Sequence, residues 1–215
     1  MARWDVPDLI YIKGQAMVKT IVGSFDNFSE AHKVANDLRS AGFIDSDISI
    51  VANNASGEYA DDPRAKSAND SGTSATAKGA VTGAVVGGGA GLAASLAGLA
   101  IPGIGPIIAA GPIVATLAGA GTGAVAGGLI GGLVDLGVPE GEAEYYAEAV
   151  RRGGALVTVR ADESRASEVT DIMRDHGAVD IEGRVERWRE SGWERFDAGA
   201  DPYSADQIRQ DRALY

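Results

Sequence analysis

The sequence predicts an α+β protein in which two β-α-β halves complete one four-stranded sheet and enclose a hydrophobic insert. Two observations indicate this fold class. First, residues 17–52 and 138–187 carry the same order of strand-like and helix-like patterns, and they match one another at a constant shift. Second, residues 79–134 contain no Asp, Glu, Lys, Arg or His, although charged residues make up 23% of the chain.

The first half is expected to follow a leader. Residues 1–16 show no clear period, so we treat them as a leader before the first β-α-β half at 17–52. Residues 18–25 are rich in β-branched side chains, which favours a strand. Residues 47–52 alternate apolar and polar side chains, and this alternation predicts the second strand of the half.

A helix is predicted between these two strands. Asn27 can cap its start, with Glu30 three residues later as in a capping box, and Gly42 can end it. Its apolar side chains recur at the i, i+3, i+4, i+7 spacing of a buried helix face. These apolar positions are Ala31, Val34, Ala35 and Leu38.

Glycines recur every fourth residue inside the insert, which we bound at residues 79–137. Polar residues at 53–78 precede it and predict a flexible linker. A four-residue spacing places glycines on one helix face, where two backbones can approach closely, as in small-xxx-small seams inside membranes. We therefore predict helix packing or oligomerisation through two runs of glycines: Gly79, Gly83, Gly87 and Gly91, then Gly119, Gly123, Gly127 and Gly131.

Prolines and glycines between the two runs predict a turn, because they interrupt a helix. The predicted turn residues are Pro102, Gly103, Gly105, Pro106 and Pro112. The insert is thus predicted to be a glycine-zipper helical hairpin with helices at about 79–100 and 112–134. At 1.5 Å per residue each helix would be about 33–35 Å long, enough to cross a hydrocarbon core. A flexible glycine-rich linker and a hairpin buried between copies in water remain open alternatives.

The second half is predicted at residues 138–187, where a helix at 139–152 comes first. A strand at 155–160, a helix at 164–176 and a strand at 179–187 follow. Neither half buries its apolar face alone, whereas both together form a four-stranded sheet with two helices on one side. This arrangement is the split β-α-β, or ferredoxin-like, plan.

This plan constrains the topology of any membrane hairpin. If both halves complete one sheet, both lie on the same side of a membrane, which two crossings permit and one does not. Basic residues flank the insert, namely Arg64, Lys66, Lys78, Arg151 and Arg152. The positive-inside rule then predicts a hairpin in the cytoplasmic membrane with the sheet in the cytoplasm. The alternative is a cytoplasmic soluble assembly.

The tail at residues 188–215 is polar with interspersed aromatic side chains. These aromatic residues are Trp188, Trp193, Phe196, Tyr203 and Tyr215. Such a tail packs over the sheet or serves as a docking segment for a partner or for interfacial lipid.

Composition and motifs give no support for catalysis. The chain has no cysteine, which excludes disulfides and thiol chemistry, and its net charge of −11 disfavours nucleic-acid binding. No phosphate-binding loop of the Gly-x-x-x-x-Gly-Lys-Ser/Thr kind occurs, and His32 and His176 are the only histidines. We therefore predict no catalytic, cofactor-binding or metal-binding residues and no cofactor.

Several strings in and after the insert carry a family resemblance. The string from Ile101 to Pro112, then Gly137-Val-Pro-Glu, Tyr145-Tyr146 and Val150-Arg-Arg-Gly-Gly, resembles bacterial low-temperature-induced and general stress proteins. Val22-Gly-Ser-Phe-Asp and Ala41-Gly-Phe are similar to the heat-induced general stress domain. The resemblance implies a stress-linked protein with a membrane-associated glycine-zipper insert and no established catalytic residues.

We accordingly expect a non-enzymatic stress-response protein that oligomerises through its insert in or at a membrane. The expected partners are further copies of the chain and membrane lipid, without nucleic acid, and the sequence identifies no small-molecule ligand. Two alternatives stay open: a soluble self-assembling oligomer that buries the hairpins, and a small-ligand-sensing regulatory domain, which rests on fold analogy.

Overall fold

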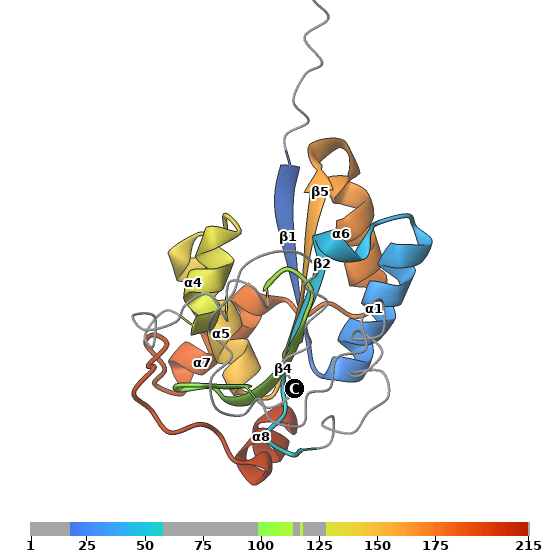
Figure 1. Cartoon of the computed structure of the whole chain (residues 1–215). Coiled ribbons are helices and arrows are strands. Elements are labelled where there is room, and N and C mark those ends of the chain that lie inside the picture. Colours follow the sequence, from blue (N-terminus) through green and yellow to red (C-terminus); the bar gives the residue numbers. More distant parts are fainter. Residues whose placement is uncertain (1–17, 58–98, 114–116, 118–127, 215) are drawn as a thin grey trace, which may run out of the picture.

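The computed structural model describes residues 18–57, 99–113, 117 and 128–214. Within these residues, five strands form one antiparallel sheet with helices on both faces (Figure 1). The strand order across the sheet is β1-β5-β2-β4-β3. The strands are β1 (Val18–Phe25), β2 (Ile48–Asn53), β3 (Leu99–Ile101), β4 (Gly105–Ala110) and β5 (Ala155–Asp162).

Six α-helices are described in this part of the chain. They are α1 (Phe28–Ser40), α4 (Gly128–Asp135), α5 (Glu140–Arg151), α6 (Ala166–Asp175), α7 (Ile181–Glu190) and α8 (Ala205–Arg212). Short 3₁₀ helices precede β2 and α6, at Asp45–Asp47 and Glu163–Arg165. Helices α1 and α6 lie on one side of the sheet, and α4, α5 and α7 lie on the other (Figure 1).

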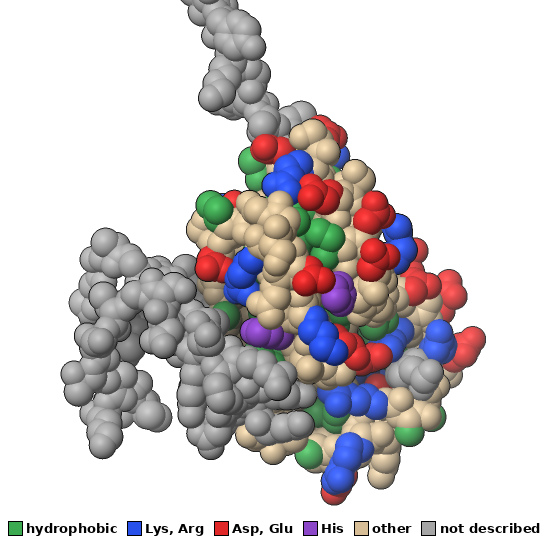
Figure 2. Space-filling model, turned by 90° about the vertical axis from the view of Figure 1, so that its right-hand side faces the viewer, with side chains coloured by type: hydrophobic (Ala, Val, Ile, Leu, Met, Phe, Trp, Pro, Cys, Tyr) green, Lys and Arg blue, Asp and Glu red, His purple; other side chains and the backbone are tan. Residues whose placement is uncertain are grey.

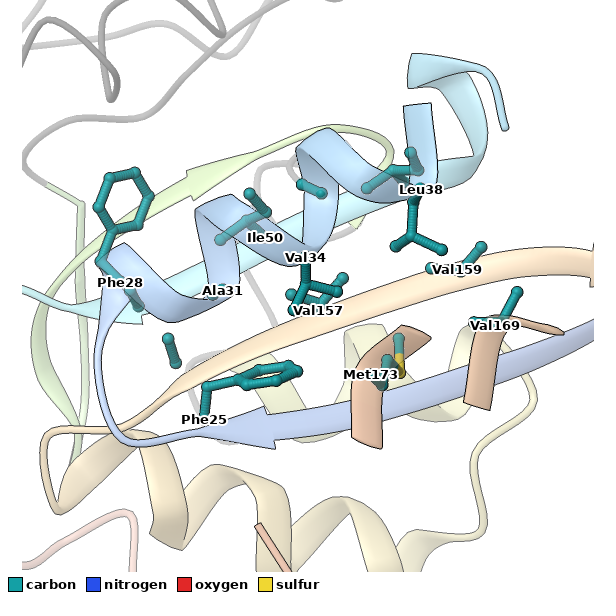
Figure 3. Packing of buried hydrophobic residues seen from close by; sticks show 14 of the residues in the cluster. Phe25, Phe28, Ala31, Val34, Leu38, Ile50, Val157, Val159, Val169 and Met173 are labelled. Carbon is teal, nitrogen blue, oxygen red and sulfur yellow. The ribbon is translucent and has the colours of Figure 1, made fainter. Parts of the chain in front are cut away.

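The first face of the sheet has the helix that the sequence predicts. The Glu30 amide donates to Asn27 Oδ1 at 3.0 Å, which confirms Asn27 as the N-cap of α1. The four apolar positions predicted to face the core are all fully buried. Figure 3 shows three of them, Ala31, Val34 and Leu38, above β5 in the cluster that also contains Phe25 of β1 and Met173 of α6.

The outer surface of the layer formed by α1 and α6 carries both acidic and basic side chains. Figure 2 shows acidic and basic side chains intermixed over the side of the molecule that α1 and α6 form. Many of them are paired; for example, His176 Nε2 lies 2.6 Å from Asp37 Oδ2 and joins α6 to α1. Exposed pairs of this kind add little stability each, so the apolar cluster beneath holds this layer together.

The second face of the sheet is built largely from the insert. Side chains of β3, β4 and α4 pack with α5 in one apolar cluster, together with Val51 and Leu156 from the two central strands. Ile107, Ile113 and Leu133 are fully buried in it. Because burying one such side chain contributes about 1.5–3 kcal/mol, the described part of the insert is a major contributor to the core.

The predicted helical hairpin is therefore wrong over the described residues at the end of its first helix. Leu99 and Ala100 lie in β3 instead of a helix, and β4 pairs with β2 in the register Val51↔Ala109 and Asn53↔Ile107. The turn does form at 102–104, but it joins two strands. The β-branched isoleucines around it favour a strand, and an available sheet edge pairs the backbone. Residues 79–98 lie outside the described residues.

The second predicted helix, at 112–134, is helical where the structure describes α4, and residues 114–116 and 118–127 lie outside the described part. The boundary of the predicted linker at 53–78 also shifts. Asn53 is the last residue of β2, and the Asn54 amide donates to Pro106 O at 2.8 Å. Residues 58–78 and the predicted leader at 1–16 lie outside the described residues.

The predicted fourth strand at 179–187 is wrong, because the chain forms α7 there. Apolar side chains at 179, 181 and 185 alternate, yet Ile181, Val185 and Trp188 also follow the i, i+4, i+7 spacing of a helix face. Asp180 Oδ1 accepts from the Gly183 amide at 3.2 Å and caps the helix. Because these three side chains can pack on α5, the chain forms a helix here instead of a strand. In the described residues the sheet has five strands instead of four, and β1 is one of its edges.

Candidate functional site

A cluster of charged side chains that includes a fully buried carboxylate forms where α5 ends. Glu148 has no exposed surface, and its Oε1 lies 2.7 Å from Arg152 Nε. Its other carboxylate oxygen lies 3.5 Å from Arg151 Nη1. Arg152 Nη1 in turn lies 2.8 Å from Asp211 Oδ1, which comes from α8. Glu148, Arg151, Arg152 and Asp211 are called the charged cluster below.

Helix geometry explains why these groups meet. Arg151 and Arg152 follow Glu148 at the i+3 and i+4 positions, where side chains on one helix are neighbours. Both arginines also lie at the carboxyl end of α5, where the helix dipole favours positive charge. The guanidinium of Arg152 stacks over the Trp188 ring, 4.8 Å from its centre, and Tyr203 lies 5.4 Å away on the same guanidinium.

The electrostatics of Arg152 follow from this setting. Burial acts to lower its pKa, whereas the Glu148 carboxylate, through its charge and its hydrogen bond, raises it. The pKa of Arg152 ends above its ordinary value because Tyr203 and Asp211 add to the effect of Glu148. The guanidinium is therefore permanently charged, and the cluster does not titrate through it near neutral pH.

A small pocket lies beside the charged cluster, between β1 and α8. Its lining includes Ser24, Arg152, Arg184 and Arg212. Each arginine there already has an acceptor: Arg184 Nη2 lies 2.7 Å from Asp26 Oδ1, and Arg212 donates to Gly153 O. An anion entering the pocket would compete with those acceptors, and neither histidine lines it to activate the serine. The ion pairs of this pocket therefore join α5 to α8 and α7 to the end of β1.

Burial also acts on Tyr146 of α5. Desolvation, followed by the nearby carboxylates of Glu142 and Glu182, raises the pKa of Tyr146 to about 12. The phenol is therefore neutral at physiological pH, with its oxygen 3.5 Å from Val22 O of β1. In the residues that the structure describes, no group of three or more His, Asp or Glu side chains is placed to hold a metal ion.

Most of the predicted oligomerisation glycines lie outside the described residues. These are Gly79, Gly83, Gly87, Gly91, Gly119, Gly123 and Gly127. Gly131 lies in α4, and a Cβ added there meets no atom within 4 Å, so its face of the helix is open. Close approach occurs at Gly128, where an added Cβ would lie 2.9 Å from Ile101 Cγ2 of β3. The role of these glycines in an oligomer stays a prediction.

The predicted turn residues contact the C-terminal tail. A Cβ added at Gly103 would lie 2.7 Å from Asp197 O, and one at Gly105 would lie 2.9 Å from Pro202 Cβ. Both glycines have positive φ angles, of 75° and 95°. Pro102 and Pro106 are exposed, and Pro112 follows β4 beside Gly111. The tail therefore packs directly on the β3–β4 hairpin.

From the sequence, Arg151 and Arg152 were counted among the basic residues that flank the insert, and Glu148 was missed. A signal was present: Glu148 lies among the buried helix positions Ala147, Ala149 and Val150, and it has arginines at i+3 and i+4. A buried charge is tolerated when it is paired, so this spacing points to a buried ion pair.

Comparison with protein-family models, with curated proteins and with solved structures finds no match. Among the helices of the described residues, none combines the length and the apolar character that a membrane crossing requires. The fold class shown is thus a mixed α/β protein with a five-stranded antiparallel sheet and helices on both faces.

Proposed function

We propose that this chain is a non-enzymatic stress-response protein that associates with further copies of itself through an uncharged glycine-rich segment. That segment comprises residues 79–98 and 118–127. The α/β domain would hold the ends of the segment in fixed positions. The resemblance to general stress proteins supports the stress-linked part of the proposal. The self-association is supported by the positions of Ile101, Leu117 and Leu129, which flank the segment and are called the anchoring residues below.

The observation that carries the proposal is that these anchoring residues share one apolar cluster. Ile101 follows the first part of the segment, Leu117 precedes the second part, and Leu129 follows it. All three are buried in the second-face cluster, and Gly128 of α4 lies against Ile101 of β3. Both parts of the glycine-rich segment are thus tied to the same region of the domain, where glycine faces of two copies can meet.

The lengths of the two uncharged parts of the segment favour self-association over a membrane-crossing hairpin. Asn53 and Leu99 belong to one sheet, so any crossings between them come in pairs. Of the intervening residues only 79–98 form an uncharged run long enough to cross the hydrocarbon core as a helix, and this run supplies a single crossing. Residues 118–127 would span about 15 Å as a helix, half of the roughly 30 Å hydrocarbon core.

We also propose a ferredoxin-like origin for the domain. The neighbours β1-β5-β2, with α1 and α6 on one face, agree with three strands and both helices of that plan. In this interpretation α7 replaces the fourth strand beside β1, and the β3–β4 hairpin extends the sheet beyond β2.

The test is a pair of glycine substitutions in the segment. Gly87→Leu combined with Gly127→Leu places a bulky side chain on each of the two predicted glycine faces, which prevents close approach of two backbones. We expect the assembly to dissociate to a monomer, as measured by multi-angle light scattering. Gly141→Leu is the matched control, because Gly141 is an exposed helix glycine of α5 with open space around it. That variant is expected to assemble like the wild type.

The same samples are tested for flotation with vesicles of anionic phospholipid. If the wild-type chain is monomeric without vesicles but floats with them, the segment binds lipid and the proposal of self-association is wrong. Assembly that is unchanged in the double variant would rule out the glycine faces as the contact.

A further inference from the structure

The C-terminal part of the chain forms a strap across the domain. We define the strap as residues 193–214, which follow α7 and a turn at Gly192. Trp193 begins it, with its ring 5.8 Å from Trp188 and 6.0 Å from Tyr145. Residues 194–204 then run without helix or strand to α8. The strap is therefore fixed at its start by aromatic packing and at its end by α8.

The middle of the strap lies on the β3–β4 hairpin. The backbone at Asp197 and Ala198 fits against Gly103, and Pro202 fits against Gly105. Phe196 packs on the second-face apolar cluster, which the hairpin helps to form. The strap thus covers the hairpin that directly follows residues 79–98 of the glycine-rich segment.

Polar contacts dominate the attachment of the end of the strap. Asp211 pairs with Arg152, and Arg151 Nη2 donates to Asp201 O at 3.0 Å. The Tyr203 ring lies 4.9 Å from the Arg151 guanidinium. Ile208 is the one residue of α8 that is buried, and it lies on Gly153. With so little apolar burial, α8 depends on its charged contacts.

The charged cluster is arranged so that the strap can leave without exposing an uncompensated charge. Arg152 contacts two carboxylates, Glu148 from its own helix and Asp211 from the strap. When Asp211 departs, Glu148 remains 2.7 Å from the guanidinium and keeps it paired. Release therefore avoids the large penalty of leaving a buried ion without a partner.

We propose that the strap is an autoinhibitory clasp: while Asp211 is paired with Arg152, the strap covers the β3–β4 hairpin and limits self-association. This inference rests on the proposed function. Opening of the clasp uncovers the strap-facing side of the hairpin and the apolar cluster beneath Phe196, and both surfaces favour contact with a second copy.

Asp211→Asn tests the clasp in the full-length chain. The change removes the charge and keeps the size, and Glu148 still compensates Arg152. We expect tryptic cleavage after Arg195, within the strap, to become about tenfold faster or more, because cleavage reports local opening. We also expect larger assemblies by light scattering at the same concentration.

Asp206→Asn is the matched control for this experiment. It removes the same charge from α8, but Asp206 is exposed and pairs with Arg209 within the helix. We expect wild-type cleavage and assembly size. Equal cleavage of the wild type and D211N would disprove the clasp, and faster cleavage without larger assemblies would disprove its inhibitory role. Because cleavage is read independently of assembly, a failure of the clasp is distinguishable from a failure of the proposed self-association.

Discussion

Replacing Glu148 with alanine is expected to lower the free energy of unfolding by about 3–5 kcal/mol, because it removes one partner from a buried ion pair. Glu148 is fully buried, and it contacts both Arg151 and Arg152. Without its carboxylate, Arg151 loses its charged partner and Arg152 keeps only Asp211. Urea unfolding followed by tryptophan fluorescence measures the loss, with Trp188 reporting directly because it lies against Arg152.

Glu144→Ala is the control for this substitution. Glu144 lies one turn earlier on α5 and is only half-buried. We expect a change within about 0.5 kcal/mol, as for most substitutions outside special contacts. Equal losses in the two variants would contradict the view that the charged cluster stabilises the fold.

Gly111→Ala is expected to lower the free energy of unfolding by about 2–6 kcal/mol, as the sum of backbone strain and overpacking. Gly111 follows β4 with φ of +86°, and an added Cβ would lie 2.1 Å from Ile48 O and 2.8 Å from Ser49 Cα. Both of these atoms belong to the backbone of β2, so relief requires that the strands separate. The loss is measured by thermal and urea unfolding.

Gly137→Ala separates the two causes of that loss. Gly137 has nearly the same φ, +93°, but an added Cβ meets no atom within 4 Å. We expect only the conformational part, about 1–2 kcal/mol. If Gly111→Ala costs no more than Gly137→Ala, the close contact between β2 and the end of β4 is incorrect.

The parts of the fold that depend on local signals were predictable. The strand Val18–Phe25 and the capped helix after it have β-branched residues, an N-cap and an apolar stripe within a short stretch. The strand starting at Ala155 was predicted for the same reason. Residues 179–187 satisfy both a strand and a helix period, and only packing of Ile181, Val185 and Trp188 on α5 selects the helix.

The β3–β4 hairpin of the insert was not predictable from local patterns. The prolines and glycines at 102–112 indicate a turn, but β4 is held by pairing with β2, from which a long stretch of chain separates it. The energy of that pairing comes from backbone hydrogen bonds and from buried isoleucines, and a contact between such distant residues leaves no local pattern.

The charged cluster was only half visible in the sequence. The i+3 and i+4 spacing after Glu148 indicates contacts within α5, whereas the contact of Arg152 with Asp211 joins residues 59 positions apart. No period or motif predicts such a pair. The contacts of Asp197 and Pro202 with the glycines of the β3–β4 hairpin are likewise not predicted by any local pattern.

Hydrogen exchange of β4 in lipid-free buffer tests most directly whether the insert is part of the sheet. Peptides that cover Gly105–Ala110 are followed by mass spectrometry beside peptides from β5, the central partner of β1 and β2. We predict that the amides of β4 exchange slowly, on the timescale of β5, without any membrane present. Rapid exchange of β4, or protection that arises only after vesicles are added, would contradict the structure of the insert described here and the self-association proposed from it.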